Sequence, residues 1–161
     1  MADESEGVEV SETGQGRYQM KVHAGGLEFL ADEPVEAGGQ GTGPNPYQLI
    51  SAALGACTAM TVRLYAERKG WALDSVSVRV LHRRDGLDAK DRFARELILE
   101  GRLSDEQRAR LKEIAEKCPV HRTLERGSDV TTILADNPLT GRDPDPGPDD
   151  HFRDMCEACE D

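Results

Sequence analysis

The residues in this chain that are best suited to chemistry are its four cysteines, because a thiolate can attack an electrophile, exchange with a disulfide or bind a metal. Cys57 lies in a long uncharged stretch, and Cys118 directly precedes Pro119. Cys156 and Cys159 form a Cys-x-x-Cys motif near the C-terminus. Three interpretations are open: redox chemistry of a thiol pair, a metal site, or burial of the cysteines as small apolar residues.

A structural zinc site is the metal alternative. His121 follows Cys118 at Cys-x-x-His spacing, and Cys156 with Cys159 could complete a set of four ligands. In the simpler interpretation His121 is a surface or packing residue and the last two cysteines lie in solvent. A third interpretation makes these two a thiol relay that reduces a disulfide elsewhere in the chain. We favour the simpler one, because the composition of the last segment predicts disorder.

Cys57 belongs to a predicted central helix. The helix should begin at Asn45 and Pro46, since Asn caps the free amide groups of a first turn and Pro suits the first helical position. From Leu49 to Val62 there is no charged residue, so no face of this helix suits water and we expect it to be buried. By helical spacing, the apolar residues on the side of Cys57 are Leu49, Ala53, Met60 and Leu64.

Small residues on the same helix leave a shallow groove in which a second helix or a partner chain could approach closely. These residues are Ser51, Gly55 and Ala59. A membrane span would need roughly 20 apolar residues. The apolar run is shorter than that and Arg63 follows it at once, so we expect no membrane span.

Alternation of apolar and polar residues predicts the strands that surround this helix. They are expected at residues 18–23, 27–30, 76–81, 93–99 and 130–134. The first two should form a hairpin through Gly25 and Gly26, and the next two should pair antiparallel. A loop rich in Gly and Pro, residues 32–44, should lead into the central helix.

Cys118 follows a second predicted helix, which opens with the capping box of Ser104 and Gln107. The apolar positions that share one face of this helix are Leu111, Ile114, Ala115 and Cys118. Cys118 therefore stands either at a helix C-terminus, where the dipole disfavours a thiolate, or at the N-cap of a new turn. One packing of the two helices would bring the sulfurs of Cys57 and Cys118 together, although on spacing alone we favour the simpler interpretation, in which both thiols are buried as small apolar residues.

Length and charge limit the function classes. At 161 residues, 37% of them hydrophobic, the chain can bury one core. The net charge of −11 comes mainly from the two ends, and residues 13–135 are nearly neutral without a basic patch, which argues against nucleic-acid binding. The N-terminus has neither a positive nor an apolar region of a signal peptide, so we expect a cytoplasmic, reducing location.

Three segments are expected along the chain. Residues 1–14 should be an acidic flexible leader, residues 15–136 the ordered domain, and residues 137–161 an acidic tail rich in Pro and Gly that carries the Cys-x-x-Cys. The tail has too little apolar content to fold alone.

Three motifs carry a family resemblance: GPNPYQLISAALGACTAMTVRLYAERKGW, KCPVHRTLE and FLADEPVEAGG. Together they resemble the family of osmotically inducible protein C (OsmC) and the organic hydroperoxide resistance (Ohr) proteins, over roughly residues 15–135. The resemblance implies an α+β fold in which two chains intertwine as a homodimer, with antiparallel sheets wrapped around two long central helices. It implies a thiol peroxidase of the oxidative stress response, without a cofactor, that acts on small organic hydroperoxides.

In this resemblance Cys57 is the cysteine that attacks the peroxide, and Cys118 resolves the resulting sulfenic acid into a disulfide. The reductant of the family is a dithiol, in some members a lipoylated protein. This hypothesis competes with a non-enzymatic binding module, whose thiols are packing residues or bind zinc through the four residues Cys118, His121, Cys156 and Cys159.

The chain departs from the family pattern at one position. The peroxidase branches have a glutamate where this chain has Tyr47, and that glutamate orients an arginine beside the reactive thiol. Arg17 and Arg122 are candidates for the arginine, with surface positions as the simpler interpretation, and Asp32 or Glu33 could supply a carboxylate. The sequence thus resembles a branch that keeps both cysteines and lacks the glutamate.

Overall fold

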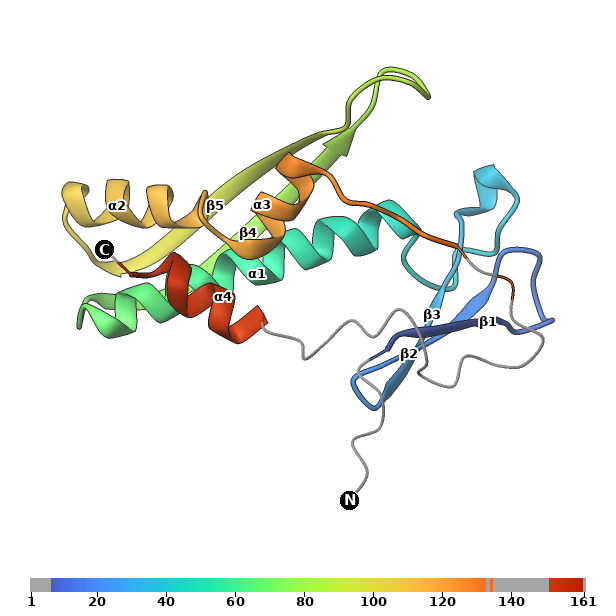
Figure 1. The fold of residues 1–161 in the computed structure, drawn as a ribbon, viewed down its shortest axis with the longest axis horizontal. Helices are drawn as coiled ribbons and strands as arrows, with labels where there is room; N and C mark the ends of the chain where they lie inside the picture. The colour runs from blue at the N-terminus through green and yellow to red at the C-terminus, as the bar shows by residue number, and fades with distance from the viewer. Residues whose placement is uncertain (1–6, 133, 135–150, 161) are drawn as a thin grey trace. The chain divides into compact units, whose positions relative to one another are not determined.

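The computed structural model describes residues 7–132, 134 and 151–160. The chain divides into two compact units (Figure 1). The first comprises Met1–Leu49 and Thr131–Asp149, and the second comprises Ile50–Val130 and Asp150–Asp161.

A three-stranded antiparallel sheet forms the first unit. Its strands, in spatial order, are β1 (Glu9–Glu12), β2 (Met20–Ala24) and β3 (Leu27–Ala31). The predicted hairpin is confirmed, and Gly25 and Gly26 turn it with φ values of 56° and 74°, a region that favours glycine. Strand β1 lies within the segment expected to be a flexible leader, so that expectation is wrong for residues 9–12.

The loop that leads to the central helix contains a short 3-10 helix, η1 (Val35–Ala37), and is closed around Asp32. The buried carboxylate of Asp32 accepts hydrogen bonds from the backbone N–H groups of Glu33, Gln40 and Thr42 and from Thr42 Oγ1, at 2.8–3.2 Å. Burial alone would raise the pKa of Asp32, but these hydrogen bonds outweigh it and lower the pKa. Asp32 therefore holds its own loop together.

The central helix, α1 (Pro46–Arg68), begins where the sequence predicts. Asn45 Oδ1 accepts a hydrogen bond from the N–H of Gln48, and Gln48 Oε1 accepts one from the N–H of Asn45, both at 2.9 Å. Burial on all sides is not observed in the single chain. The buried residues occupy one side: Leu54, Cys57, Thr58, Thr61, Val62, Tyr65 and Ala66. Ala53 and Met60, expected beside Cys57 on a buried face, are exposed.

Among the described residues, α1 is also the one helix that is long and apolar enough to cross a membrane by length and composition. Within the chain, 39% of its apolar window is buried. Core helices of globular proteins meet the same criterion, so the expected absence of a membrane span stays a prediction.

In the second unit α1 packs against a long antiparallel hairpin made of β4 (Ala72–Arg83) and β5 (Arg92–Arg102) (Figure 1). The two strands and their pairing confirm the prediction, with Val76 opposite Leu99. A Cβ atom added at Gly55 would lie 3.4 Å from Val80 Cγ2. Strand β4 therefore occupies part of the groove that was expected to receive a helix or a partner chain.

Two helices follow the hairpin, α2 (Asp105–Ala115) and α3 (Pro119–Arg126). The capping box of Ser104 and Gln107 is present, as predicted. Helix α2 ends at Ala115, and Cys118 is the N-cap of α3. Of the two positions that the sequence left open for Cys118, a helix C-terminus or an N-cap, the structure has the N-cap. The main core of this unit joins α1, β4, α2 and the C-terminal segment, with these buried members: Val62, Tyr65, Ala66, Leu73, Leu111, Ile114, Ala115 and Cys159.

The C-terminal segment corrects the expectation of a solvated tail. Residues His151–Ala158 form a helix, α4, on which Met155, Ala158 and the following Cys159 are buried. The guanidinium of Arg68 donates to the carbonyl of Cys156 at 3.0 Å. Composition pointed to disorder because the apolar residues of this segment are few, but they fall on one helical face. The remainder of the expected tail up to residue 150 lies outside the described residues.

The expected last strand at residues 130–134 is not found in its described part. Val130, Thr131 and Thr132 have no regular secondary structure, and Val130 is 88% exposed. Ile133 lies outside the described residues. Among the described residues no strand pairs with this segment, and an alternating apolar pattern without a partner strand does not form a ladder.

Candidate functional site

Cys57 and Cys118 lie in one buried cluster between α1 and the start of α3. Both are free thiols, with 2% and 0% of their surface exposed. Leu54 completes the buried part of the cluster, and the residues packed around it are Val80, Phe93, Val120 and Leu124. The packing of the two elements thus brings the two cysteines together, as the sequence allowed.

The sulfur of Cys118 contacts two polar groups. As the N-cap of α3, its Sγ accepts a hydrogen bond from the backbone N–H of His121 at 3.4 Å. Thr58 Oγ1 lies 3.6 Å from the same sulfur. Pro119 at the first helical position fixes this cap, because its φ is preset and it has no N–H of its own to satisfy.

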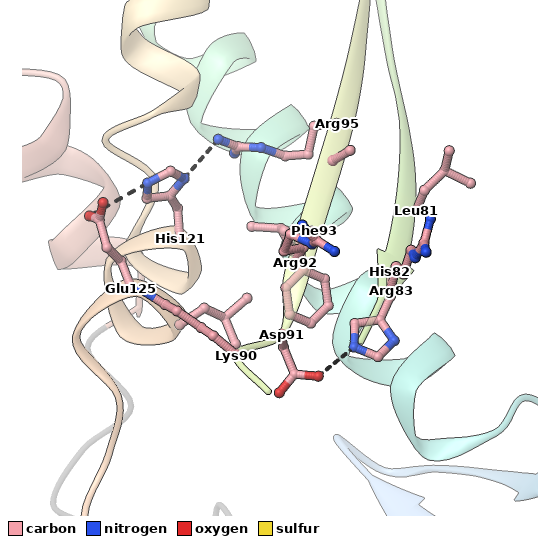
Figure 2. A pocket seen from close by; sticks show the side chains of 13 residues that line it. Leu81, His82, Arg83, Lys90, Asp91, Arg92, Phe93, Arg95, His121 and Glu125 are labelled. Carbon is pink, nitrogen blue, oxygen red and sulfur yellow. Dashed lines mark hydrogen bonds and ion pairs between the residues drawn. The ribbon is translucent and has the colours of Figure 1, made fainter. Parts of the chain in front are cut away.

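An arginine from β5 supports this arrangement. The Nη1 atom of Arg95 donates to Thr58 Oγ1 at 2.8 Å and to the carbonyl of Ala115 at 2.9 Å, and its Nη2 lies 2.7 Å from Nδ1 of His121. Because a guanidinium can only donate, Nδ1 is the acceptor and the ring proton of neutral His121 lies on Nε2. Nε2 is 3.6 Å from Glu125 Oε2, which completes the chain of contacts in Figure 2.

These surroundings place the negative charge of the reduced pair on Cys118. A hydrogen bond from the thiol of Cys57 lowers the pKa of Cys118 to about 5, against the effect of burial, with further help from the His121 amide, Thr58 and Arg95. The same hydrogen bond, together with burial, raises the pKa of Cys57. Both pKa shifts favour the proton on Cys57 and the negative charge on Cys118.

Cys57 has two further polar neighbours. The backbone N–H of Val120 points to its Sγ at 3.5 Å. Nε2 of His151, the first residue of α4, lies 3.3 Å from the same sulfur. The segment expected to be a solvated tail thus contributes a side chain to the site.

The sequence predicted an arginine near the thiols but not which one. Arg17 is exposed, with its guanidinium 5.0 Å from the ring centre of Tyr18, and Arg122 is exposed on α3. Arg95 was missed, although the alternation of the strand could have indicated it. On β5 it lies between Phe93 and Leu97, at one of the positions whose side chains face inward. A charged residue in that register needs buried partners.

The four residues considered as zinc ligands are not assembled. Sγ of Cys159 donates to the carbonyl of Thr61 at 3.6 Å, while Cys118 and His121 belong to the Arg95 network. Within the part of the chain that the structure describes, no group of three or more His, Cys, Asp or Glu side chains is arranged to hold a metal ion.

An open pocket of about 980 Å³ borders the cysteine cluster, between the end of the β4–β5 hairpin and α3 (Figure 2). Leu54, Phe93 and Leu124 belong both to its wall and to the packing around the cysteines. Arg95 and His121 add polar groups to the same wall. The pocket wall thus combines apolar side chains next to the cysteine cluster with charged ones such as Arg95, and neither cysteine is among the residues that line it.

An α+β fold of antiparallel sheets and helices, with two cysteines in one buried cluster, defines the class of protein. A model of the family described as OsmC-like protein matches residues 39–133. The chain therefore belongs to the OsmC-like family. A search of curated protein sequences found no match.

Solved structures share the fold. An OsmC-like protein from Mycoplasma pneumoniae is 16% identical, with a TM-score of 0.63 over 77% of this chain and 89% of that one. An organic hydroperoxide resistance protein OsmC from Legionella pneumophila is 23% identical, with a TM-score of 0.57 over 77% and 91%. The organic hydroperoxide resistance protein OhrB of Bacillus subtilis is 25% identical, with a TM-score of 0.53 over 76% and 91%.

Proposed function

We propose that this protein is a cysteine-based organic hydroperoxide reductase in which Cys57 attacks the peroxide and Cys118 resolves the product. The observation that carries the proposal is the shared buried cluster of the two thiols, with Cys118 among donors that stabilise its thiolate. The family includes hydroperoxide resistance proteins, which supports this reaction class.

In the first step the sulfur of Cys57 attacks the terminal oxygen of the hydroperoxide. An S–O bond forms, the O–O bond breaks, and its electron pair leaves with the alkoxide, so that sulfur is oxidised by two electrons as the peroxide is reduced. The proton that Cys57 gives up is the one the alkoxide needs to become an alcohol. The products are Cys57 sulfenic acid and an alcohol.

In the second step the thiolate of Cys118 attacks the sulfur of Cys57 sulfenic acid. A disulfide forms, and hydroxide leaves and takes up a proton to become water. The depressed pKa of Cys118, held by its hydrogen bonds, keeps it in the form that this step requires at neutral pH. The apolar wall of Leu54, Phe93 and Leu124 suits a hydroperoxide with a small organic group.

A complete cycle needs an external dithiol to reduce the disulfide, and a reducing, cytoplasmic location fits such a partner. A second copy of the chain is the other proposed partner. Between Leu49 and Val62, the side of α1 that is exposed in the single chain carries Ile50, Ala53, Ala56 and Met60 and no charge, which suits the interior of a homodimer.

Substitution of each cysteine tests the proposal. Cys57→Ser is expected to abolish consumption of an organic hydroperoxide such as cumene hydroperoxide by the reduced protein. Cys118→Ser is expected to allow one turnover and leave a sulfenic acid that dimedone traps on Cys57. Cys156→Ser is the matched control and should keep full turnover. A fully active Cys57→Ser variant would end the proposal.

A further inference from the structure

Helix α4 carries a side chain into the site from outside the family match, which covers residues 39–133. Its first residue, His151, is half-buried and places Nε2 3.3 Å from the Sγ of Cys57, within hydrogen-bond reach for a sulfur atom. The helix is anchored behind this contact by buried Met155, Ala158 and Cys159 and by the hydrogen bond from Arg68. The imidazole is thus held at the reacting atom by a packed element.

The chemistry of the pair leaves a task for such a group. Attack by Cys57 requires the loss of its proton, whereas Cys118 is needed as a thiolate in the next step. If Cys118 accepted the proton, it would lose the form in which it resolves the sulfenic acid. A second acceptor beside Cys57 lets both steps proceed without this conflict.

We propose that His151 is the base for Cys57 in the peroxide reaction, an inference that rests on the proposed function. In the tautomer with its ring proton on Nδ1, Nε2 accepts the S–H proton of Cys57, which turns from the sulfur of Cys118 toward the ring as the sulfur of Cys57 attacks the terminal peroxide oxygen. The imidazolium then gives this proton to the departing alkoxide, which leaves as an alcohol. The backbone N–H of Val120 stabilises the transient thiolate. Atoms and charge balance without a further reactant.

The alternative for His151 is a structural one, in which the ring only fills space between α4 and the cysteine cluster. A glutamine at this position would keep most of the volume and a hydrogen-bonding amide but could not take up a proton. An alanine would leave a space that a small base can enter. The two substitutions therefore separate packing from proton transfer.

The test measures how fast Cys57 reacts with iodoacetamide at pH 7, peptide by peptide, in the reduced full-length protein and its His151→Gln and His151→Ala variants. General-base assistance predicts that both variants slow the modification of Cys57 by about tenfold or more. Added imidazole should restore much of the rate in His151→Ala, whereas pyrazole, a ring of similar size and far weaker basicity, should not. His23→Gln, at an exposed position on β2, should match the wild type.

Cys159 reports in the same digest whether α4 is still docked. A slow Cys57 together with a rapidly modified Cys159 would assign the effect to loss of the helix and overturn the proposal, as would unchanged or faster modification of Cys57 in both variants. Equal rescue by pyrazole would also overturn it. In this test iodoacetamide takes the place of the peroxide. If the protein does not consume hydroperoxide but the reactivity of Cys57 still depends on His151, the proposed function fails while the role of His151 as a base for Cys57 stands.

Discussion

One proton is shared between the sulfurs of Cys57 and Cys118, and single residues decide where it lies. The amide of His121, the hydroxyl of Thr58 and the charge of Arg95 all favour a thiolate on Cys118. The hydrogen bond with Cys118, together with burial, raises the pKa of Cys57, which favours the proton on its thiol. In the proposed mechanism, the reduced site is thus prepared for the resolving step, and the attacking step depends on proton removal from Cys57.

Removal of the Arg95 charge should weaken this arrangement. Arg95→Met loses both the cation near Cys118 and the hydrogen bond that orients Thr58. We expect the pKa of Cys118 to rise by about one unit, which lowers the thiolate fraction about twofold near pH 6 and about tenfold near pH 4. Peptide-resolved alkylation of Cys118 across pH 4 to 9 measures it. Arg92→Met, on an exposed position of the same strand, is the control, and an equal alkylation midpoint in both variants would contradict the role of Arg95.

The low pKa of Cys118 also predicts how stability depends on pH. Between about pH 5, where the folded thiol titrates, and its ordinary value of 9.0, the unfolded chain holds a proton that the folded chain has released. Stability contributed by Cys118 should therefore rise with pH through this window and vanish as pH falls toward 5.

Thermal unfolding with a non-thiol reductant at pH 5.5 and pH 8 tests this dependence. The difference in Tm between the wild type and Cys118→Ser should be larger at pH 8, and other titrating groups cancel in the comparison. A Tm difference that is the same at both pH values, or larger at pH 5.5, would mean that Cys118 is not a stabilised thiolate.

The sequence predicted both cysteines of this site but not their polar neighbours. Cys57 stands out because it lies on the apolar side of a predictable helix, and Cys118 because it follows the apolar face of predicted helix α2 and directly precedes Pro119. Arg95 and Thr58 were missed because their roles depend on which strand and helix meet, and this information is not local to either segment. His151 could not be predicted at all, since its contact joins positions 94 residues apart.

At the scale of elements, α4 is the least expected and the most consequential part of the second unit. It buries only a few side chains, but it supplies His151 to Cys57 and protects Cys159. Burial raises the pKa of the Cys159 thiol, which should make it slow to react.

Docking of α4 should depend on Met155. Met155→Ala removes most of a buried side chain, and we expect the free energy of unfolding to fall by about 2 kcal/mol. Cys159 should then react faster with iodoacetamide in the native protein. Phe152→Ala, on the same helix but 66% exposed, is the matched control. Unchanged protection of Cys159 in Met155→Ala would show that Met155 does not anchor the helix.

Elements with a local signal were predicted well. The start of α1, the two hairpins and the capping box of α2 depend on neighbouring residues, and the structure confirms them. Strand β1 is held by its pairing with the next strand, β2, and helix α4 by a core far along the chain, but both segments have few apolar residues, so composition alone gave flexible ends. The strand expected at residues 130–134 is absent from its described part for the converse reason. The sequence pattern there favours a strand, but it has no partner strand among the described residues.

At the scale of the whole molecule, the exposed apolar side of α1 is the feature that a single chain does not explain. Met60 is 52% exposed in the middle of a helix without charged residues from Leu49 to Val62. In the proposed homodimer this surface is buried, and a charge placed there would be costly to desolvate.

Met60→Glu should therefore shift the protein from dimer to monomer, as measured by size-exclusion chromatography with light scattering. Leu87→Glu changes an 84% exposed leucine in the β4–β5 turn and should leave the dimer intact. A wild-type protein that is monomeric at micromolar concentration, or a Met60→Glu variant that remains dimeric, would contradict this use of α1.

The most direct measurement on the intact protein is peptide mapping under non-reducing conditions after one equivalent of an organic hydroperoxide, at low protein concentration. The two-cysteine mechanism predicts a disulfide between the peptides that contain Cys57 and Cys118, with Cys156 and Cys159 still reduced. If Cys57 and Cys118 both remain free while the hydroperoxide persists, or if the linkage forms only between Cys156 and Cys159, then the buried pair is not the reacting centre.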